Sequence, residues 1–427
     1  MSIAQNKNMV LTERGLAPSA LSSITDKLAK SHAFETWAGH RAVSYYESIS
    51  EEYFAIRNSI GMIDVSLLHK YLISGKDALD YVNRLVTRDI RKIKHNRVAY
   101  CLWCDEEGMV IDDGTIFHLA GDQFMLTCQE SQWSWLLDLR EGFDITIEDI
   151  THNVATIAIQ GPAAYHLLKR LSDTKLEGFE IPDVKNMKPF DCIEWKGDTT
   201  ARFTKSGKIA LMISRTGFTG DLGYELWCHR DLIETLWHSL LAVGKNLRIQ
   251  PAGQIALGLA RIEAGFIATN LDFMSSHIAS RHGRGRTPFE LLMGKLVHFD
   301  KPYFNGKEAL WRLSGGGDKK IIKKNLRFLL QPIDIACKKE AKGSIVYYKE
   351  KIECGHITSS LWSPTLKRNV GYAELKAPYG IFKTQHLFAE VWTNKENMFE
   401  KVMAPLDLCE RPFFNPPRKT QTPPGLV

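Results

Sequence analysis

The stretch that decides the fold runs from Val98 to Cys128 and reads VAYCLWCDEEGMVIDDGTIFHLAGDQFMLTC. It contains three apolar segments, separated by the short polar sequences DEEG and AGD. Acidic residues next to glycine are typical of tight turns between strands. The stretch therefore predicts an antiparallel meander. Its strands are expected at residues 98–104, 109–117 and 123–128.

Helical and strand patterns alternate irregularly on both sides of this meander. Apolar residues at helical spacing predict several helices, the first of which is expected to end at Gly61 as its C-cap. These helices are expected at residues 51–61, 77–86, 133–140, 231–243 and 251–265. A second strand–turn–strand unit is expected at 209–228, and the tail from 326 to about 393 alternates like the strands of a small barrel. Strands mixed with helices without βαβ regularity indicate an α+β fold.

The composition is that of an ordinary globular protein of two or three domains. The 427 residues include 55 Lys and Arg against 49 Asp and Glu, a net charge of +6. This charge is too dilute to indicate a nucleic-acid partner. No apolar run is long enough to span a membrane, and the first residues lack an apolar signal core. The eight scattered Cys residues form no disulfide framework. We therefore expect a cytoplasmic protein without a membrane partner.

Common catalytic motifs are missing from the sequence. There is no G-x-x-x-x-G-K-[ST] and no strand followed by G-x-G-x-x-G, so nucleotide chemistry lacks its usual signal. There is also no H-E-x-x-H and no G-x-S-x-G. The 14 His residues do not pair at the spacing of metal ligands. The sequence predicts no metal site.

Three acidic residues lie inside predicted strands, namely the neighbours Asp112 and Asp113 and the more distant Glu225. Asp112 and Asp113 are neighbours and must point to opposite faces, both of which carry apolar residues, so at least one carboxylate is expected to be half-buried. From the pattern alone, a functional role and a structural role are equally acceptable, the latter being a pairing with Arg or the anchoring of a neighbouring turn. Glu225 follows the glycine-rich turn TGFTGDLG, where a carboxylate could accept two parallel N–H bonds or simply lie exposed.

Seven segments resemble one family, in the order that the family keeps. They are IRNSIGMIDVS (56–66), EGMVIDD (107–113), IQGP (159–162), SRTGFTGDLGYE (214–225), RIEAG (261–265), NGKEAL (305–310) and GHITSSLWSPTLK (355–367). From about Phe34 to about Phe414 the chain is similar to the glycine-cleavage T-protein superfamily. That superfamily comprises folate-dependent aminomethyltransferases and tetrahydrofolate-dependent demethylases.

The resemblance implies a three-domain ring, or cloverleaf, with a central folate site and a small C-terminal β-barrel. Residues 1–30 would be a lead-in and residues 31–315 two intertwined folate-binding domains. Residues 316–427 would form the barrel domain. The implied cofactor is tetrahydrofolate, which supplies its own nucleophile, N5.

The resemblance also assigns roles to single residues. Asp113 matches the family's essential aspartate beside folate N5 and N10, and it is the implied catalytic residue. Glu225 matches the glutamate that holds the pterin ring, and Tyr100 matches a tyrosine that contacts the folate. Phe117 stands where the family has a phenol, so packing against the folate can survive but a hydroxyl bond cannot.

The part of the family pattern that concerns the substrate is altered. Leu257 and Gly258 stand where an arginine and an aspartate are usual, and the early segment at 39–46 is rewritten as GHRAVSYY. A basic insertion at about Ser275–Arg286 has no assigned role. The expected substrate-contacting residues are His40, Arg41, Tyr46 and Leu257. The folate half of the site is kept.

These departures favour a tetrahydrofolate-dependent methyltransferase, or demethylase. It would move a methyl group from a small sulfonium, methylamine or methoxy donor to N5 of tetrahydrofolate. The partner would be a small methylated substrate, and self-association into a homo-oligomer is left open. The alternative is a glycine-cleavage aminomethyltransferase. A non-catalytic folate-binding protein of iron–sulfur assembly is less favoured, because Tyr303 stands where that branch has cysteine. A fragment of a flavin oxidase is disfavoured, because we expect no dinucleotide-binding segment before the module.

Overall fold

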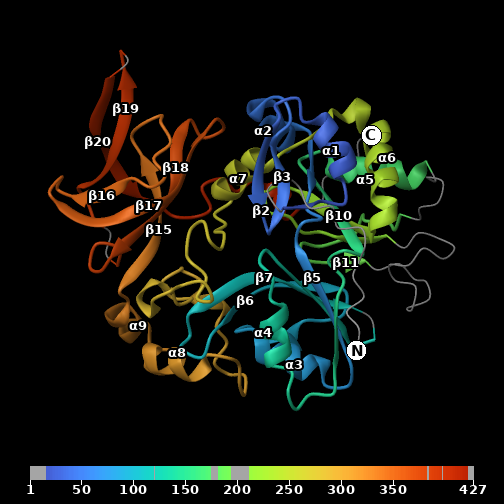
Figure 1. Cartoon of the computed structure of the whole chain (residues 1–427), viewed down its shortest axis with the longest axis horizontal. Coiled ribbons are helices and arrows are strands. Elements are labelled where there is room, and N and C mark those ends of the chain that lie inside the picture. The colour runs from blue at the N-terminus through green and yellow to red at the C-terminus, as the bar shows by residue number, and fades with distance from the viewer. Residues whose placement is uncertain are drawn as a thin grey trace.

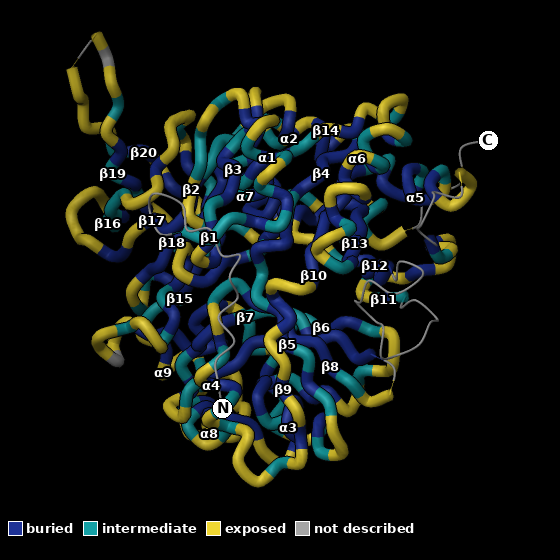
Figure 2. The backbone as a smooth tube through the Cα atoms, turned by 45° about the vertical axis from the view of Figure 1, so that its right-hand side comes forward, coloured by how far each residue is buried: buried dark blue, intermediate teal, exposed yellow. Residues whose placement is uncertain are grey.

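The computed structural model arranges the chain in three lobes around a common centre (Figure 1). It describes residues 16–119, 121–174, 181–193, 211–381, 384–396 and 398–421. Buried residues concentrate inside each lobe, whereas the β19–β20 hairpin of the barrel extends outward with an exposed tip (Figure 2). Among the described residues, no helix combines the length and apolar character that crossing a membrane requires.

The first lobe is built on the predicted meander, which we call the meander sheet. Its described strands, in spatial order, are β6 (Arg97–Cys104), β7 (Val110–Leu119), β8 (Gln123–Cys128), β5 (His69–Ser74) and β9 (Thr146–Asp149). Helices α3 (Ala78–Leu85) and α4 (Trp133–Asp138) pack on one face around a shared apolar cluster. The turn before β7 requires Gly108, whose φ is +78°. A Cβ there would lie 2.8 Å from Leu310 Cγ.

The second lobe contains a mixed sheet, which we call the central sheet. Its described strands, in spatial order, are β11 (Cys192–Ile193), β12 (Met212–Ser214), β13 (Gly223–His229), β10 (Val154–Gln160), β4 (Ile60–Asp64) and β14 (Ile249–Pro251). Helices α5 (Ala164–Asp173) and α6 (Ile233–Gly244) share one apolar cluster with this sheet. Helices α2 (Ile49–Asn58) and α7 (Gln254–Glu263) share a second cluster with it.

A small three-stranded sheet adjoins the second lobe. It has the order β1 (Ala17–Pro18), β3 (His40–Tyr45) and β2 (Ala33–Trp37), and α1 (Ser22–Leu28) follows β1. Of the predicted lead-in, residues 1–15 lie outside the described residues, and its extent stays a prediction. Short 3-10 helices connect the larger elements. They are η1 (Ile90–Lys92), η3 (Arg230–Leu232), η4 (Lys245–Leu247), η5 (His282–Arg284), η6 (Gly294–Leu296) and η7 (Pro417–Lys419).

The third lobe is a closed barrel, as predicted. Its described strands, in order around the barrel, are β15 (Phe328–Ile335), β18 (Arg368–Lys376), β17 (Ile352–Ser363), β16 (Ile345–Tyr348), β19 (Leu387–Lys395) and β20 (Met398–Leu408). Helices α8 (Lys307–Ser314) and α9 (Lys319–Asn325) precede it and contact each other. The boundary predicted between residues 315 and 316 lies in the turn between these helices and stays a prediction. The α+β class with a C-terminal barrel is confirmed.

After β20 the chain leaves the barrel and returns to the second lobe; we call residues 409–421 the return segment. Its Phe414 N–H donates to the Glu263 carbonyl at 2.8 Å, and Arg418 forms an ion pair with Asp221 at 2.6 Å. Asp221 also pairs with Arg57, which binds Glu263 at 2.6 Å. A buried arginine needs such partners, because an unpaired charge is costly to desolvate. The return segment thus completes a network that joins α2 to α7.

Some predicted boundaries differ from the structure. The helix expected at 51–61 ends at Asn58, and Gly61 lies inside β4 instead of capping the helix. The reason is close packing, because a Cβ on Gly61 would lie 2.4 Å from Ile56 Cγ1. Of the strand expected from residue 209, residues 212–214 form β12, while 209 and 210 lie outside the described residues.

Candidate functional site

The meander sheet and the central sheet face each other across a small apolar cluster. Phe117 on β7 packs edge-to-face on Trp227 of β13, with ring centroids 5.3 Å apart. Val98, Met125 and Met212 belong to the same cluster. Alternate residues of a strand share a face, so Asp113 lies on the Phe117 face of β7 and Glu225 on the Trp227 face of β13. The two predicted carboxylates therefore occupy facing surfaces.

Asp113 is held by two hydroxyl groups, one from the neighbouring strand and one from a distant segment. The Tyr100 hydroxyl on β6 donates to Asp113 Oδ2 at 2.6 Å, and the Thr269 hydroxyl donates to Oδ1 at 2.8 Å. Burial raises the pKa of Asp113, while these two donors oppose the rise by stabilising the anion. Each carboxylate oxygen therefore accepts one hydroxyl hydrogen bond, and the two bonds together fix the orientation of the carboxylate.

The Asp112 side chain lies on the opposite face of β7 from Asp113 and accepts hydrogen bonds from backbone N–H groups. Its Oδ1 accepts from the Asp113 N–H at 2.9 Å, and its Oδ2 accepts from the Glu130 N–H at 3.2 Å and from Gln132 Nε2 at 3.3 Å. Burial, and then the charge of Asp113, raises the pKa of Asp112. Asp112 thus ties the segment after β8 to β7, which is a positioning role, and leaves Asp113 as the carboxylate with reactive potential.

Glu225 is oriented from one side only. Its Oε2 accepts from the Thr216 hydroxyl at 2.5 Å and lies 3.4 Å from the Ser214 hydroxyl. Trp227 Nε1 in turn donates to Ser214 at 3.0 Å. Burial raises the pKa of Glu225, and both hydroxyls oppose that rise. Within the described part of the chain, Oε1 receives no hydrogen bond, so this oxygen is available to a ligand.

A cavity of about 400 Å³ lies where the barrel meets the return segment. Its lining residues are Leu292, Gln331, Pro332, Ile381, Leu408, Cys409, Glu410 and Arg411. Arg411 donates to the carbonyls of Leu291 and Leu292. Burial raises the pKa of Tyr100, and the positive charge of Arg411 is among the groups that oppose this rise. One side chain that lines the cavity, Arg411, therefore acts electrostatically on Tyr100.

Three of the predicted substrate residues lie elsewhere. Arg41 pairs with Asp26 and lies over the Phe34 ring at 4.6 Å. Arg41 and Tyr46 line a cavity large enough only for water, which Asp64 also lines. Asp64 pairs with Ile157 in the central sheet, whereas Glu225 pairs with the next residue, Ala158. Asp64 and Glu225 therefore point to opposite faces of that sheet.

His40 lies beside two other histidines. It is buried on β3, and its ring centroid lies 6.4 Å from those of His69 and His152. Burial and the His152 charge lower the pKa of His40, so the ring is neutral at pH 7. Leu257 is buried in the apolar cluster of α2 and α7, which includes Ala158, the cross-strand partner of Glu225. Of the four, Leu257 alone adjoins the Glu225 surface in the described contacts.

The basic insertion packs against the start of β7. The Val110 N–H donates to the Arg286 carbonyl at 2.8 Å, and the Ser276 N–H donates to the Val110 carbonyl at 3.0 Å. The Arg286 side chain forms an ion pair with Glu374 of β18 at 2.6 Å. At this end, the insertion joins the meander sheet to the barrel.

Comparison with known proteins settles the family. The family model described as the GCVT N-terminal domain matches residues 24–301. The chain belongs to the GCVT family. The predicted resemblance is confirmed, and membership makes the chain an enzyme of the one-carbon transferase class.

Curated GCVT relatives span most of the chain. An aminomethyltransferase of Thermoanaerobacter sp. is 30% identical over 368 residues, covering 83% of this chain and 91% of its own. One from Caldanaerobacter subterraneus is 29% identical, covering 80% of this chain and 84% of its own. The crystal structure of the glycine-cleavage aminomethyltransferase T from Bartonella henselae superposes with a TM-score of 0.76 at 19% identity. That match covers 94% of this chain and 98% of the other, and it supports the fold.

Sequence reasoning missed several residues of this GCVT-family site. Thr269 lies 156 residues from Asp113 along the chain, so no local pattern could indicate that their side chains meet. Ser214 and Thr216 were quoted within a motif, but their contacts with Glu225 depend on the pairing of β12 with β13. The sequence does not distinguish the role of Asp112 from that of Asp113, whereas the structure shows that the Asp112 carboxylate accepts from two backbone N–H groups.

Proposed function

We propose that this chain transfers an aminomethyl-type one-carbon unit to tetrahydrofolate bound between the meander sheet and the central sheet. One observation carries the proposal. The Asp113 carboxylate is fixed by two hydroxyls on a surface that faces Glu225, where a ligand could meet both. Relatives named aminomethyltransferase favour an aminomethyl donor over the methyl donor expected from the sequence.

The donor set fits a pterin. The aminopyrimidine edge of a pterin offers neighbouring N–H donors, and a carboxylate is the acceptor that matches them. Glu225 has its Oε2 engaged by hydroxyls and its Oε1 open among the described residues. Since burial raises the pKa of Glu225, N–H donors would stabilise the ionised form. The hydroxyls of Thr216 and Ser214 stabilise the ionised form of Glu225 in the same way.

Tetrahydrofolate would supply the nucleophilic nitrogen N5, and the chain would supply position and charge. Asp113 would orient the N5–N10 edge, stabilise positive charge that develops there and accept the released proton. The Tyr100 and Thr269 hydroxyls keep the carboxylate in one orientation, so that no reorganisation is needed during transfer. Neither hydroxyl needs to touch the substrate for this role.

Product analysis of the purified full chain tests the proposal. With tetrahydrofolate and an aminomethyl group carried on a lipoyl protein, we expect methylenetetrahydrofolate, ammonia and the dihydrolipoyl protein. The Asp113→Asn variant is the control and should give little product. Formation of methyltetrahydrofolate from a methyl donor, with no product from the aminomethyl carrier, would overturn the aminomethyl proposal.

Methyl transfer remains a second candidate because of α7. Leu257 places an apolar side chain where the family has a cation, and Gly258 leaves open space around its Cα, with nothing within 4 Å of an added Cβ. Of the expected donors, the uncharged methoxy class would suit this apolar surface best. The same assay, run with a panel of sulfonium, methylamine and methoxy donors, separates the two candidates by their folate product.

A further inference from the structure

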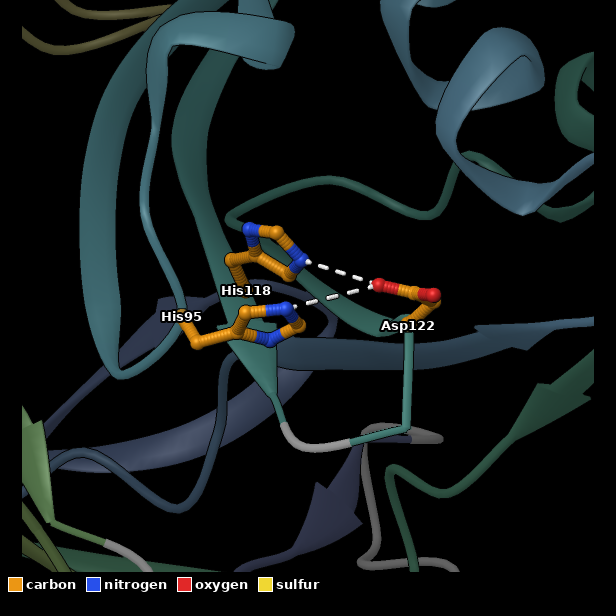
Figure 3. Close-up of side chains that lie close together, drawn as sticks. All are labelled: His95, His118 and Asp122. Atoms are coloured by element: carbon orange, nitrogen blue, oxygen red, sulfur yellow. Dashed lines mark ion pairs between the residues drawn. The ribbon is translucent and has the colours of Figure 1, made fainter.

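Two histidines and an aspartate meet at the far end of β7. His95 comes from the loop before β6, His118 from β7 itself and Asp122 from the turn between β7 and β8 (Figure 3). Their ligand atoms all lie within 4.8 Å of one another. His118 is five residues from Asp113, or about 17 Å along a strand, so this cluster is separate from the folate site.

Both rings present the same nitrogen to the aspartate. His118 Nδ1 lies 2.7 Å from the Ile93 carbonyl, and His95 Nδ1 lies 3.3 Å from the Leu119 carbonyl. A carbonyl oxygen only accepts, so each Nδ1 carries the proton and each Nε2 keeps its lone pair. Metal-binding histidines are oriented by such second hydrogen bonds. In Figure 3 both Nε2 atoms point toward Asp122.

The buried nitrogen has no other role among the described residues. The His118 side chain is only 9% exposed, and its Nε2 has no hydrogen-bond partner there. The ring is fixed by stacking on its cross-strand neighbour Phe124, with centroids 4.6 Å apart. A buried lone pair without a donor is unfavourable, and a bound cation would satisfy it.

We propose that His95, His118 and Asp122 bind one Zn²⁺ ion. His95 Nε2 lies 3.5 Å from Asp122 Oδ1, and His118 Nε2 lies 3.7 Å from it. Ligands about 2.05 Å from a tetrahedral zinc are separated by about 3.4 Å, whereas neighbouring ligands in octahedral sites are separated by about 3.0 Å. The two His–Asp spacings are nearer the tetrahedral value. His95 and Asp122 are more than half exposed, so water can occupy the fourth position.

The ion would join three separate pieces of backbone. It would fasten the loop before β6 and the β7–β8 turn to the end of β7, and therefore stabilise the hairpin. Binding to the folded chain raises its stability in proportion to the logarithm of ligand concentration. A zinc-dependent rise in melting temperature is therefore part of the expected result.

Zinc titration of the chelator-treated full chain, against a chromophoric indicator, tests the proposal. We expect one Zn²⁺ per chain and an affinity about tenfold or more weaker in each of His95→Ala and Asp122→Asn. These positions are exposed, so the variants should fold. The matched control is His238→Ala, an exposed histidine on α6 with unchanged zinc affinity expected.

A second measurement distinguishes this site from nonspecific zinc binding. X-ray absorption of the zinc-loaded chain should show four nitrogen or oxygen ligands at about 2.0 Å, including imidazoles. Zinc should raise the melting temperature of the wild type and not of either variant. If both variants bind zinc within twofold of the wild-type affinity, or zinc leaves the wild-type melting temperature unchanged, the proposal is wrong.

Discussion

The two ends of strand β7 carry polar clusters built on opposite principles. At the Asp113 end, hydroxyl donors converge on an acceptor and stabilise a negative charge. At the His118 end, acceptors converge on a common point and no donor of the described residues satisfies the buried nitrogen. The first arrangement suits a ligand that brings N–H groups, and the second suits a cation. The hydrogen-bonding balance of a cluster, more than its residue types, indicates what it binds.

The largest effect is expected at Asp113. Asp113→Asn keeps the size of the side chain but removes the charge that we assign to N5 and to proton acceptance. Turnover should fall by a factor on the order of 10² or more, with folate binding largely retained. Stopped-flow or steady-state assays with folate titration measure both quantities. The control is Asp80→Asn, an exposed carboxylate on α3. Unchanged turnover would remove Asp113 from the chemistry.

A smaller loss is expected at Glu225. Glu225→Gln replaces an anionic acceptor by a neutral one, which weakens each N–H bond from the pterin. The apparent affinity for tetrahydrofolate should fall about tenfold, with a smaller change in kcat. Glu148→Gln changes an exposed strand glutamate of the meander sheet and should leave KM unaltered. A change confined to kcat would place Glu225 outside the folate contact.

The Tyr100 hydroxyl should affect the pH dependence of kcat/KM, because it donates a hydrogen bond to the Asp113 carboxylate. Burial raises the pKa of Asp113, so activity should fall with decreasing pH above the usual carboxyl range. Tyr100→Phe removes a donor that stabilises the anion and should raise this pKa further. The acid limb of kcat/KM would then move to higher pH, and the loss near neutral pH should be only several-fold. Tyr348→Phe, on the barrel, is the control. An acid limb that stays in place would show that Tyr100 does not tune Asp113.

Metal removal should have the smallest effect on catalysis and thus sharpen the contrast between the two ends. Chelator treatment of the zinc-loaded chain should lower the melting temperature by about 2–5 °C. One-carbon transfer should stay within about twofold, because the hydroxyls that hold Asp113 belong to Tyr100 and Thr269, which lie outside the β7–β8 turn. Calorimetry and the folate assay on the same sample measure both. A tenfold loss of turnover would show that the two ends are coupled.

The sequence predicted those parts of the fold and site that depend on near neighbours. The meander brings Tyr100 beside Asp113 because β6 and β7 are adjacent in sequence, and Gly108 marks the turn between them. The sequence did not predict contacts between residues far apart in the chain, such as the hydrogen bond from Thr269 to Asp113. The cluster of His95, His118 and Asp122 was not predicted for a related reason. His95 and His118 are 23 residues apart on different elements, so no ligand-spacing motif joins them.

The expected substrate residues teach a different lesson. His40, Arg41 and Tyr46 were chosen because their segment departs from the family pattern. The structure places His40 and Arg41 on the small three-stranded sheet and Tyr46 directly after it, with Arg41 already paired to Asp26. A rewritten segment can therefore reflect a change in local packing and need not mark a new binding site. Their role in substrate binding stays a prediction.

The return segment has a consequence for how the molecule is made. Arg418 meets Asp221 across 197 residues of chain, and it also donates to the carbonyl of Arg57, 361 residues away. The ion-pair network in which Asp221 joins Arg57 to Arg418 can therefore be completed only after residue 418 has left the ribosome. Contacts of such sequence separation slow folding, because long loops must close before they form. The second lobe, although its first elements are translated early, therefore cannot complete this network until nearly the whole chain has been made.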